Sequence, residues 1–272
     1  MEKNSRKSIV QIISGRHIFT VLISLFVIIG IIATYRLVSI QRNYSTAQDE
    51  YDELRQFSPI RMSSPDWIES VPGFSVLDPD SEDKLEQELE QEQDLDTMPD
   101  LSDINRDYIG WIRIEDTSID YPVVQGSDNI KYLSTTFRSE RNPSGTIFMD
   151  AGCSPGFSGF SLLHGHNMRD GSMFADLNTF PGLLTLYPDI TIFTKDGELL
   201  TFTIFDVKKT DNSNAIFSLS GQSNTAIASY FSAYGITTQD LEDGMNILVL
   251  ATCTSGGRDE RLLVFAKHND IH

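Results

Sequence analysis

The residue of this sequence best suited to nucleophilic chemistry is Cys253. It follows the strongly apolar run 247–252, which predicts a β-strand, and it is followed by a glycine-containing loop at 254–257. A thiol at a strand end that faces a loop is placed for access by a substrate. The alternatives are a buried structural cysteine and a disulfide with Cys153, the only other cysteine of the chain.

A cysteine nucleophile also needs a group that accepts and returns a proton, and histidine can fill this role. The chain has five histidines, of which His164 and His166 follow a predicted strand at 160–163 and enter a loop. Their spacing also suggests a metal, but the sequence has no HExxH or CxxC motif and its two cysteines lie far apart. We therefore expect no metal and no other cofactor.

An arginine close to the cysteine could stabilise negative charge during a reaction. Arg258 and Arg261 lie in the turn after Cys253 or at the start of the next predicted strand, 262–266. If the two strands form a hairpin, Arg261 lies near the cysteine, where its guanidinium could hydrogen-bond a developing oxyanion. A solvated arginine is the alternative, and Arg258 is a second candidate for the same role.

The elements that must position these residues are short β-strands. From about residue 101 onward, runs rich in Val, Ile, Phe and Thr alternate with turns rich in Gly, Asp, Asn or Pro. The predicted strands are 108–114, 119–124, 146–149, 160–163, 190–194, 199–207, 246–251 and 262–266. Eight such strands favour a closed barrel or a sandwich. Within this domain we also predict an amphipathic helix at 224–234 and a shorter helix at 170–177.

The N-terminal part of the chain predicts a membrane anchor. Residues 18–35 carry no charge and would span about 27 Å as a helix, close to the thickness of the hydrocarbon core of a bilayer. Basic residues precede this segment, which predicts a cytoplasmic N-terminus at 1–17 and an extracellular body. A core helix and a cleaved signal peptide are the alternatives, but the segment has few polar residues at helical spacing and no good A-x-A pattern.

Charge divides the chain near the same place. Residues 1–42 carry +5 and the remainder carries −23, which gives the net charge of −18. An acidic body argues against nucleic-acid binding, because phosphate backbones are bound by clustered Lys and Arg. Residues 36–100 hold a proline-containing stretch and an acidic low-complexity run, and we predict a stalk or linker with possible helices. Residues 101–272 form the predicted catalytic domain.

Several motifs of this domain resemble those of class B sortases. The run 250–253, with Arg261 eight residues after its cysteine, is similar to the sortase active-site signature. The run 165–174 is similar to the histidine motif of class B members. Four further segments resemble the same class in the same order, namely 110–112, 119–125, 128–133 and 145–150.

The resemblance implies a fold and a reaction. The fold is mainly β, a closed eight-stranded barrel with added helices. The protein would be a cysteine transpeptidase that cleaves a C-terminal sorting signal of a secreted protein and passes the acyl group, through a thioacyl intermediate, to an amine. In class B this amine is usually on a peptidoglycan cross-bridge, although some members build pili, where the amine would be a pilin lysine.

The resemblance also assigns roles to residues of this sequence. Cys253 is the nucleophile, His166 the general acid and base, and Arg261 the stabiliser of the oxyanion or the substrate. The positions that correspond to substrate binding are Asn129, Leu133 and Thr252.

This sequence departs from the class pattern at two positions. His164 stands where an aromatic residue is common, which leaves it as an alternative to His166, and Ala251 stands where a serine is common. Three other functions stay open: a pilus-polymerising sortase, a cysteine peptidase, and an anchored binding module without catalysis.

Overall fold

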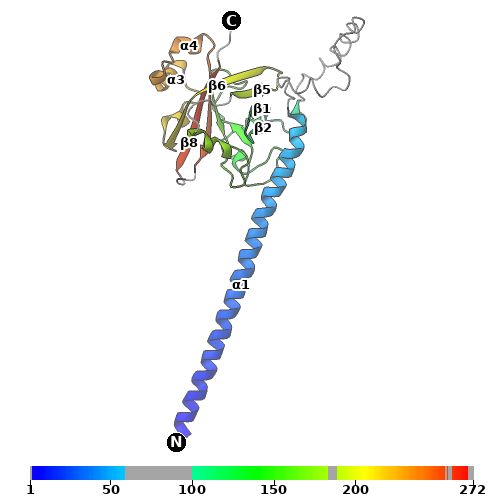
Figure 1. Cartoon of the computed structure of the whole chain (residues 1–272), viewed down its shortest axis with the longest axis vertical. Helices are drawn as coiled ribbons and strands as arrows, with labels where there is room; N and C mark the ends of the chain where they lie inside the picture. The colour runs from blue at the N-terminus through cyan, green and yellow to red at the C-terminus, as the bar shows by residue number, and fades with distance from the viewer. Residues whose placement is uncertain (1, 59–99, 183–188, 255, 257–258, 269–272) are drawn as a thin grey trace, which may run out of the picture. The chain divides into compact units, whose positions relative to one another are not determined.

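The structure is a computed structural model that describes residues 2–58, 100–182, 189–254, 256 and 259–268. The chain divides into two compact units, residues 1–46 and residues 47–272, and each is described by itself. Figure 1 shows the long N-terminal helix of the chain in blue and the β-rich part in green to red.

The first unit consists of the greater part of helix α1 (Glu2–Leu54). From Phe19 onward this helix is long and apolar enough to cross a membrane, with a mean hydropathy of 2.4 over its best window and none of that window buried. Large apolar side chains such as Phe26 are exposed along it, which water disfavours and a lipid bilayer accepts. The helix is therefore compatible with the predicted anchor at 18–35, while its sidedness stays a prediction.

The second unit is built on a closed barrel of eight strands. The strands are β1 (Tyr108–Ile114), β2 (Asp120–Val124), β3 (Ile147–Met149), β4 (Phe160–His164), β5 (Ile190–Thr194), β6 (Leu199–Asp211), β7 (Asn246–Cys253) and β8 (Glu260–His268). Their order around the barrel is β1-β2-β3-β4-β7-β8-β6-β5. The pairs β2–β3 and β4–β7 are parallel, and the other pairs are antiparallel. All eight predicted strands are confirmed, and they close into a barrel rather than a sandwich.

The strands that carry the candidate site are buried along their middle. In β7 only the first and last residues are partly exposed, and in β8 the five central residues are buried. Continuous apolar runs of this kind are typical of strands that are covered on both faces. Part of the cover comes from α3 (Asn224–Phe231), whose Phe231 ring lies 5.8 Å from Phe265 of β8 and 6.3 Å from Phe160 of β4.

The helices of the barrel domain begin and end at recognisable signals. The side chain of Ser223 caps α3 by accepting a hydrogen bond from Ala226 N, and α3 together with η9 (Ser232–Tyr234) covers the helix predicted at 224–234. A short turn then ends at Gly235, which has the positive φ that favours glycine. The remaining short helices are η1 (Arg55–Phe57), η5 (Leu101–Asp103), η6 (Lys131–Leu133), η7 (Ala175–Gly182), η8 (Ala215–Ser218), η9 (Ser232–Tyr234) and α4 (Thr238–Glu242).

The helix predicted at 170–177 is wrong in its position. Gly171 and Met173 have φ values of 87° and 59°, and such left-handed residues do not fit within a right-handed helix. The segment instead forms a turn in which Asn167 bridges to Met173, and η7 begins only at Ala175. The chain reverses here, directly after His166, because of these two conformations.

The last turns of α1 belong to the second unit and pack on the barrel. Ala47, Tyr51 and Leu54 are buried, and the Tyr51 ring lies edge-on to Tyr121 of β2 at 5.3 Å. The Tyr51 hydroxyl donates to the carbonyl oxygen of Gly145 at 2.6 Å, and burial raises the pKa of Tyr51, so it remains a donor. Part of the predicted stalk thus contacts the barrel, whereas its proline-containing stretch and acidic run, which fall in residues 59–99, lie outside the described residues.

Replacing this tyrosine tests the docking of the helix end. We expect Tyr51→Ala to lower the free energy of unfolding by about 3–5 kcal/mol, because it removes a fully buried aromatic ring. The matched variant Tyr51→Phe keeps the ring, loses only the hydroxyl, and should cost about 1 kcal/mol. Denaturant unfolding of the full chain in detergent measures both. A Tyr51→Ala variant as stable as the parent would show that the helix end does not support the barrel.

Candidate active site

Cys253 is the last residue of β7 and lies beside β8. In the β7–β8 hairpin it is paired directly with Arg261, and the Cβ atoms of such opposed residues are about 4.5–5.5 Å apart on one face of the sheet. The hairpin predicted from the sequence is therefore present, with Arg261 next to the cysteine. The competing candidate, Arg258, lies outside the described residues.

His166 reaches the same place from the other side of β7. Strand β4 runs parallel to β7 with His164 paired to Ala251, and the ladder continues by one bond from Gly165 N to the carbonyl oxygen of Ala251 at 3.1 Å. One residue further, His166 approaches the level of Cys253. The site is thus formed where three neighbouring strands end or begin at one rim of the barrel.

A backbone carbonyl orients the His166 ring. Its Nε2 lies 2.8 Å from the carbonyl oxygen of Leu133. A carbonyl oxygen can only accept, so Nε2 carries a proton, and in the neutral ring Nδ1 is then the acceptor. No local sequence pattern indicates this contact, because it joins a backbone atom to a side chain 33 positions away.

The glycine between the two histidines is required by packing. A Cβ atom on Gly165 would lie 2.5 Å from Cδ2 of Phe174 and 2.6 Å from Cδ1 of Ile147, and both distances are shorter than real contacts. Phe174 N also donates to the carbonyl oxygen of His166 at 2.9 Å. The segment 164–166 is therefore packed closely against the core, and a hydrogen bond holds it there.

One groove of about 270 Å³ joins these residues. Cys253, His166 and Arg261 line it, and so do the three residues predicted to bind substrate: Asn129, Leu133 and Thr252. Leu133 offers an exposed apolar side chain, whereas Thr252 is buried and its hydroxyl has no hydrogen-bond partner within the described part of the chain. Because successive side chains of a strand point to opposite faces, the Thr252 hydroxyl lies on the face of β7 opposite to Cys253.

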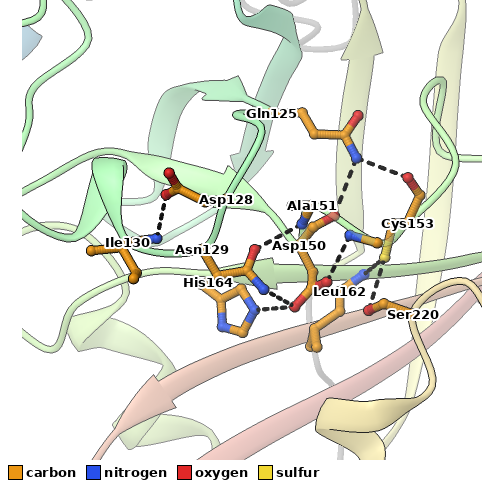
Figure 2. Close-up of polar contacts among 11 residues, drawn as sticks. Gln125, Asp128, Asn129, Ile130, Asp150, Ala151, Cys153, Leu162, His164 and Ser220 are labelled. Atoms are coloured by element: carbon orange, nitrogen blue, oxygen red, sulfur yellow. Dashed lines mark hydrogen bonds and ion pairs between the residues drawn. The ribbon is translucent and has the colours of Figure 1, made fainter.

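Asp150 is a site residue that the sequence reasoning missed. It is buried, and its carboxylate accepts hydrogen bonds from Asn129 Nδ2 at 2.8 Å, from His164 Nε2 at 3.2 Å and from Gly152 N at 3.0 Å (Figure 2). Burial alone raises the pKa of the Asp150 carboxyl, but the bonds from His164, Gly152 and Ser220 outweigh burial and hold the pKa below its usual value. The carboxylate is therefore ionised at neutral pH.

The same network fixes Asn129 and His164. Asn129 Oδ1 accepts from Ala151 N at 2.7 Å while Nδ2 donates to Asp150, so both ends of the amide are held (Figure 2). The His164 ring is stacked on Phe148, with ring centroids 5.0 Å apart, and lies parallel to Phe217 at 6.4 Å. All of these rings line the groove, which therefore has an aromatic wall.

The two cysteines are not bonded to each other. Cys153 is buried and Cys253 is partly exposed, and both are free, so the alternative of a disulfide is wrong. Within the described residues, no group of three or more His, Cys, Asp or Glu side chains is arranged to hold a metal ion.

Comparisons with known proteins point to one family. The family model described as Sortase domain matches residues 112–269, more than half of the chain. Sortase B of Listeria monocytogenes is 43% identical over 86 residues, 31% of this chain and 35% of the relative. Sortase B of Staphylococcus aureus is 38% identical over 81 residues, 29% of this chain and 33% of the relative. The chain thus spans about a third of the length of these curated relatives.

A solved structure extends the similarity over the barrel. The X-ray structure of Clostridium perfringens sortase B is 30% identical and superimposes with a TM-score of 0.55. The match covers 62% of this chain and 98% of that chain. The likeness is therefore to a whole barrel domain.

The different settings of the two thiols predict selective alkylation. We expect iodoacetamide to modify Cys253 and to spare Cys153 in the folded protein, because Cys153 is buried and burial raises the pKa of its thiol. Peptide mapping by mass spectrometry after brief labelling measures this, and both residues should react in denaturant. Preferential labelling of Cys153 in the folded state would contradict the arrangement.

Proposed function

Because the chain belongs to the sortase family, in its class B, we propose that it is a cysteine transpeptidase in which Cys253 is the nucleophile. His166 is the general acid and base, and Arg261 stabilises the oxyanion. The observation that carries this proposal is the shared groove, where a partly exposed thiol lies opposite an arginine and beside an oriented imidazole.

The first half of the reaction forms a thioacyl enzyme. The thiolate of Cys253 attacks the carbonyl carbon of the scissile peptide bond, and negative charge develops on its oxygen. The guanidinium of Arg261 stabilises that charge. The tetrahedral intermediate then collapses, the carbon–nitrogen bond breaks, and the imidazolium of His166 protonates the departing amine.

The second half transfers the acyl group to a new amine. The amine attacks the thioester carbon, a carbon–nitrogen bond forms and the carbon–sulfur bond breaks, with Cys253 leaving as a thiolate. The neutral His166 accepts the proton that the nitrogen loses. The donor substrate occupies the part of the groove formed by Asn129, Leu133 and Thr252.

The proposed setting is the outer face of a cell membrane. The apolar part of α1 is the anchor, residues 1–17 are cytoplasmic and the barrel is extracellular. The donor is a secreted protein with a C-terminal sorting signal, and the acceptor is an amine of the cell wall.

Removing the nucleophile gives the first test of this function. We expect Cys253→Ala to abolish cleavage of a quenched fluorescent peptide, chosen by screening a library of sorting-signal peptides, and to abolish the thioacyl adduct seen by intact-mass spectrometry. His166→Ala should lower the rate by about 10²–10⁴, the usual range for a general acid and base. Cys153→Ala is the matched control and should keep both signals.

The products separate the proposal from its rivals. Retained turnover in Cys253→Ala would refute the assignment of the nucleophile. A peptidase would give only the hydrolysed peptide whether or not an amine is present, and a binding module would give no adduct at all. A transpeptidase gives a ligated product when triglycine is added.

The arginine is tested by two substitutions at one position. We expect Arg261→Ala to lower the cleavage rate by about 10²–10³, as for loss of an oxyanion donor. Arg261→Lys should also be poor, because one ammonium cannot replace the planar guanidinium fork. Initial rates over a range of peptide concentrations measure both kcat and KM. If Arg258→Ala is the impaired variant and Arg261→Ala is not, the assignment moves to Arg258.

A further inference from the structure

The groove contains a second histidine that the proposed reaction does not use. The side chain of His164 is 21% exposed and lines the groove, while that of its partner Asp150 is only 8% exposed and lies behind it. The two are joined by the 3.2 Å contact between Nε2 and Oδ2. His164, held by the buried carboxylate of Asp150, is therefore a polar side chain in the otherwise aromatic wall of the groove.

The hydrogen bonds decide which nitrogen of His164 is available to a ligand. An ionised carboxylate only accepts, so Nε2 carries the proton that it donates to Asp150. In Figure 2 the other ring nitrogen points away from Asp150. In the neutral ring that nitrogen, Nδ1, is an acceptor, and the pair as a whole carries one negative charge.

The position of this pair along the groove is set by the β4–β7 register. His164 is paired with Ala251, two residues before Cys253 on β7, which is a displacement of about 6.6 Å along the strand. Ala251 has a small side chain, so the groove stays open opposite the imidazole. His164 therefore lies two residues along the strand direction from the level of the Cys253 thiol. It is within reach of a group that is bound next to the reacting carbonyl.

Charge divides the groove between its two ends. Arg261 is positive and lies at the level of Cys253, whereas the ionised carboxylate of Asp150 lies behind His164 at the next level. A developing oxyanion is favoured at the first end and a cation at the second.

We propose that Asp150 and His164 form the binding subsite for the protonated primary amine of the acyl acceptor. The inference rests on the proposed function and deepens it, because ligation exceeds hydrolysis only where the site holds an amine in preference to water. The ammonium donates to Nδ1 of His164, and the carboxylate of Asp150 stabilises the charge through the ring. Asn129 fixes the carboxylate for this purpose, with its amide held at both ends.

Two substitutions at the pair test the subsite. His164→Phe keeps an aromatic ring between Phe148 and Phe217 but has no nitrogen, and Asp150→Asn removes the charge while keeping an acceptor. Asp116→Asn is the matched control, because it removes the same charge from an exposed turn and asparagine tolerates the positive φ of that position. Denaturant unfolding checks that each variant is folded.

The measurement separates cleavage from transfer. For both variants of the pair we expect the KM for triglycine to rise by about tenfold or more, the effect of losing one hydrogen bond to a charged group, and to rise by more than any change in cleavage of the screened peptide without amine. The ratio of ligated to hydrolysed product should fall by the same factor. Hydroxylamine, which is uncharged at neutral pH, should be transferred equally well by Asp150→Asn and by the parent.

The possible results of these measurements distinguish the amine subsite from its alternatives. An unchanged KM and product ratio in both variants would overturn the subsite, as would an equal loss with hydroxylamine or with Asp116→Asn. A loss of cleavage that matches the loss of transfer would mean that the pair serves acylation instead. If the parent protein itself neither cleaves the peptide nor forms an adduct, the proposed function fails, and that result is distinct from these.

Discussion

The structure of the site depends on the register of one strand with two neighbours. Strand β7 pairs in parallel with β4 and antiparallel with β8, and both ladders must be in register for its last residue to meet Arg261 on one side and His166 on the other. A slip of one residue in either ladder would turn every side chain of the slipped strand to the opposite face. The buried middle of β7 opposes such a slip, because its side chains on both faces are closely packed and would have to fit sites shaped for their neighbours.

The closed barrel and the end of α1 support this register from outside. Closure leaves no free sheet edge at which β7 or β8 could shift. Tyr51 of α1 bonds to the carbonyl oxygen of Gly145 and contacts the hydroxyl of Thr146, which itself lines the groove. The same helix end packs on Tyr121, whose hydroxyl accepts from Met173 N in the turn after His166. The end of α1 therefore supports Thr146 of the groove and the turn that follows His166.

Local sequence patterns were enough to predict the strands but not the contacts between segments. The eight strands and the helix that begins at Asn224 follow from residue composition, periodicity and turn residues. The hairpin that pairs Cys253 with Arg261 follows from the short connection between two strands. The carbonyl of Leu133 and the carboxylate of Asp150 could not be found in this way, since both act on histidines in another segment and leave no periodic signal. The turn at 170–174 was missed because its left-handed residues include Met173, a type that rarely adopts that conformation.

The two histidines differ in what holds them, and this difference gives the groove its polarity. His166 bonds to the neutral backbone carbonyl of Leu133, which orients the ring without a charged partner in that bond. His164 bonds to a buried carboxylate that hydrogen bonds from His164, Gly152 and Ser220 keep ionised, so a cation bound near its ring is favoured. Gly165 holds both rings at one rim because the core leaves no room for a side chain between them. His164 and His166 thus lie in different environments within one groove, because their hydrogen-bond partners come from different segments of the barrel.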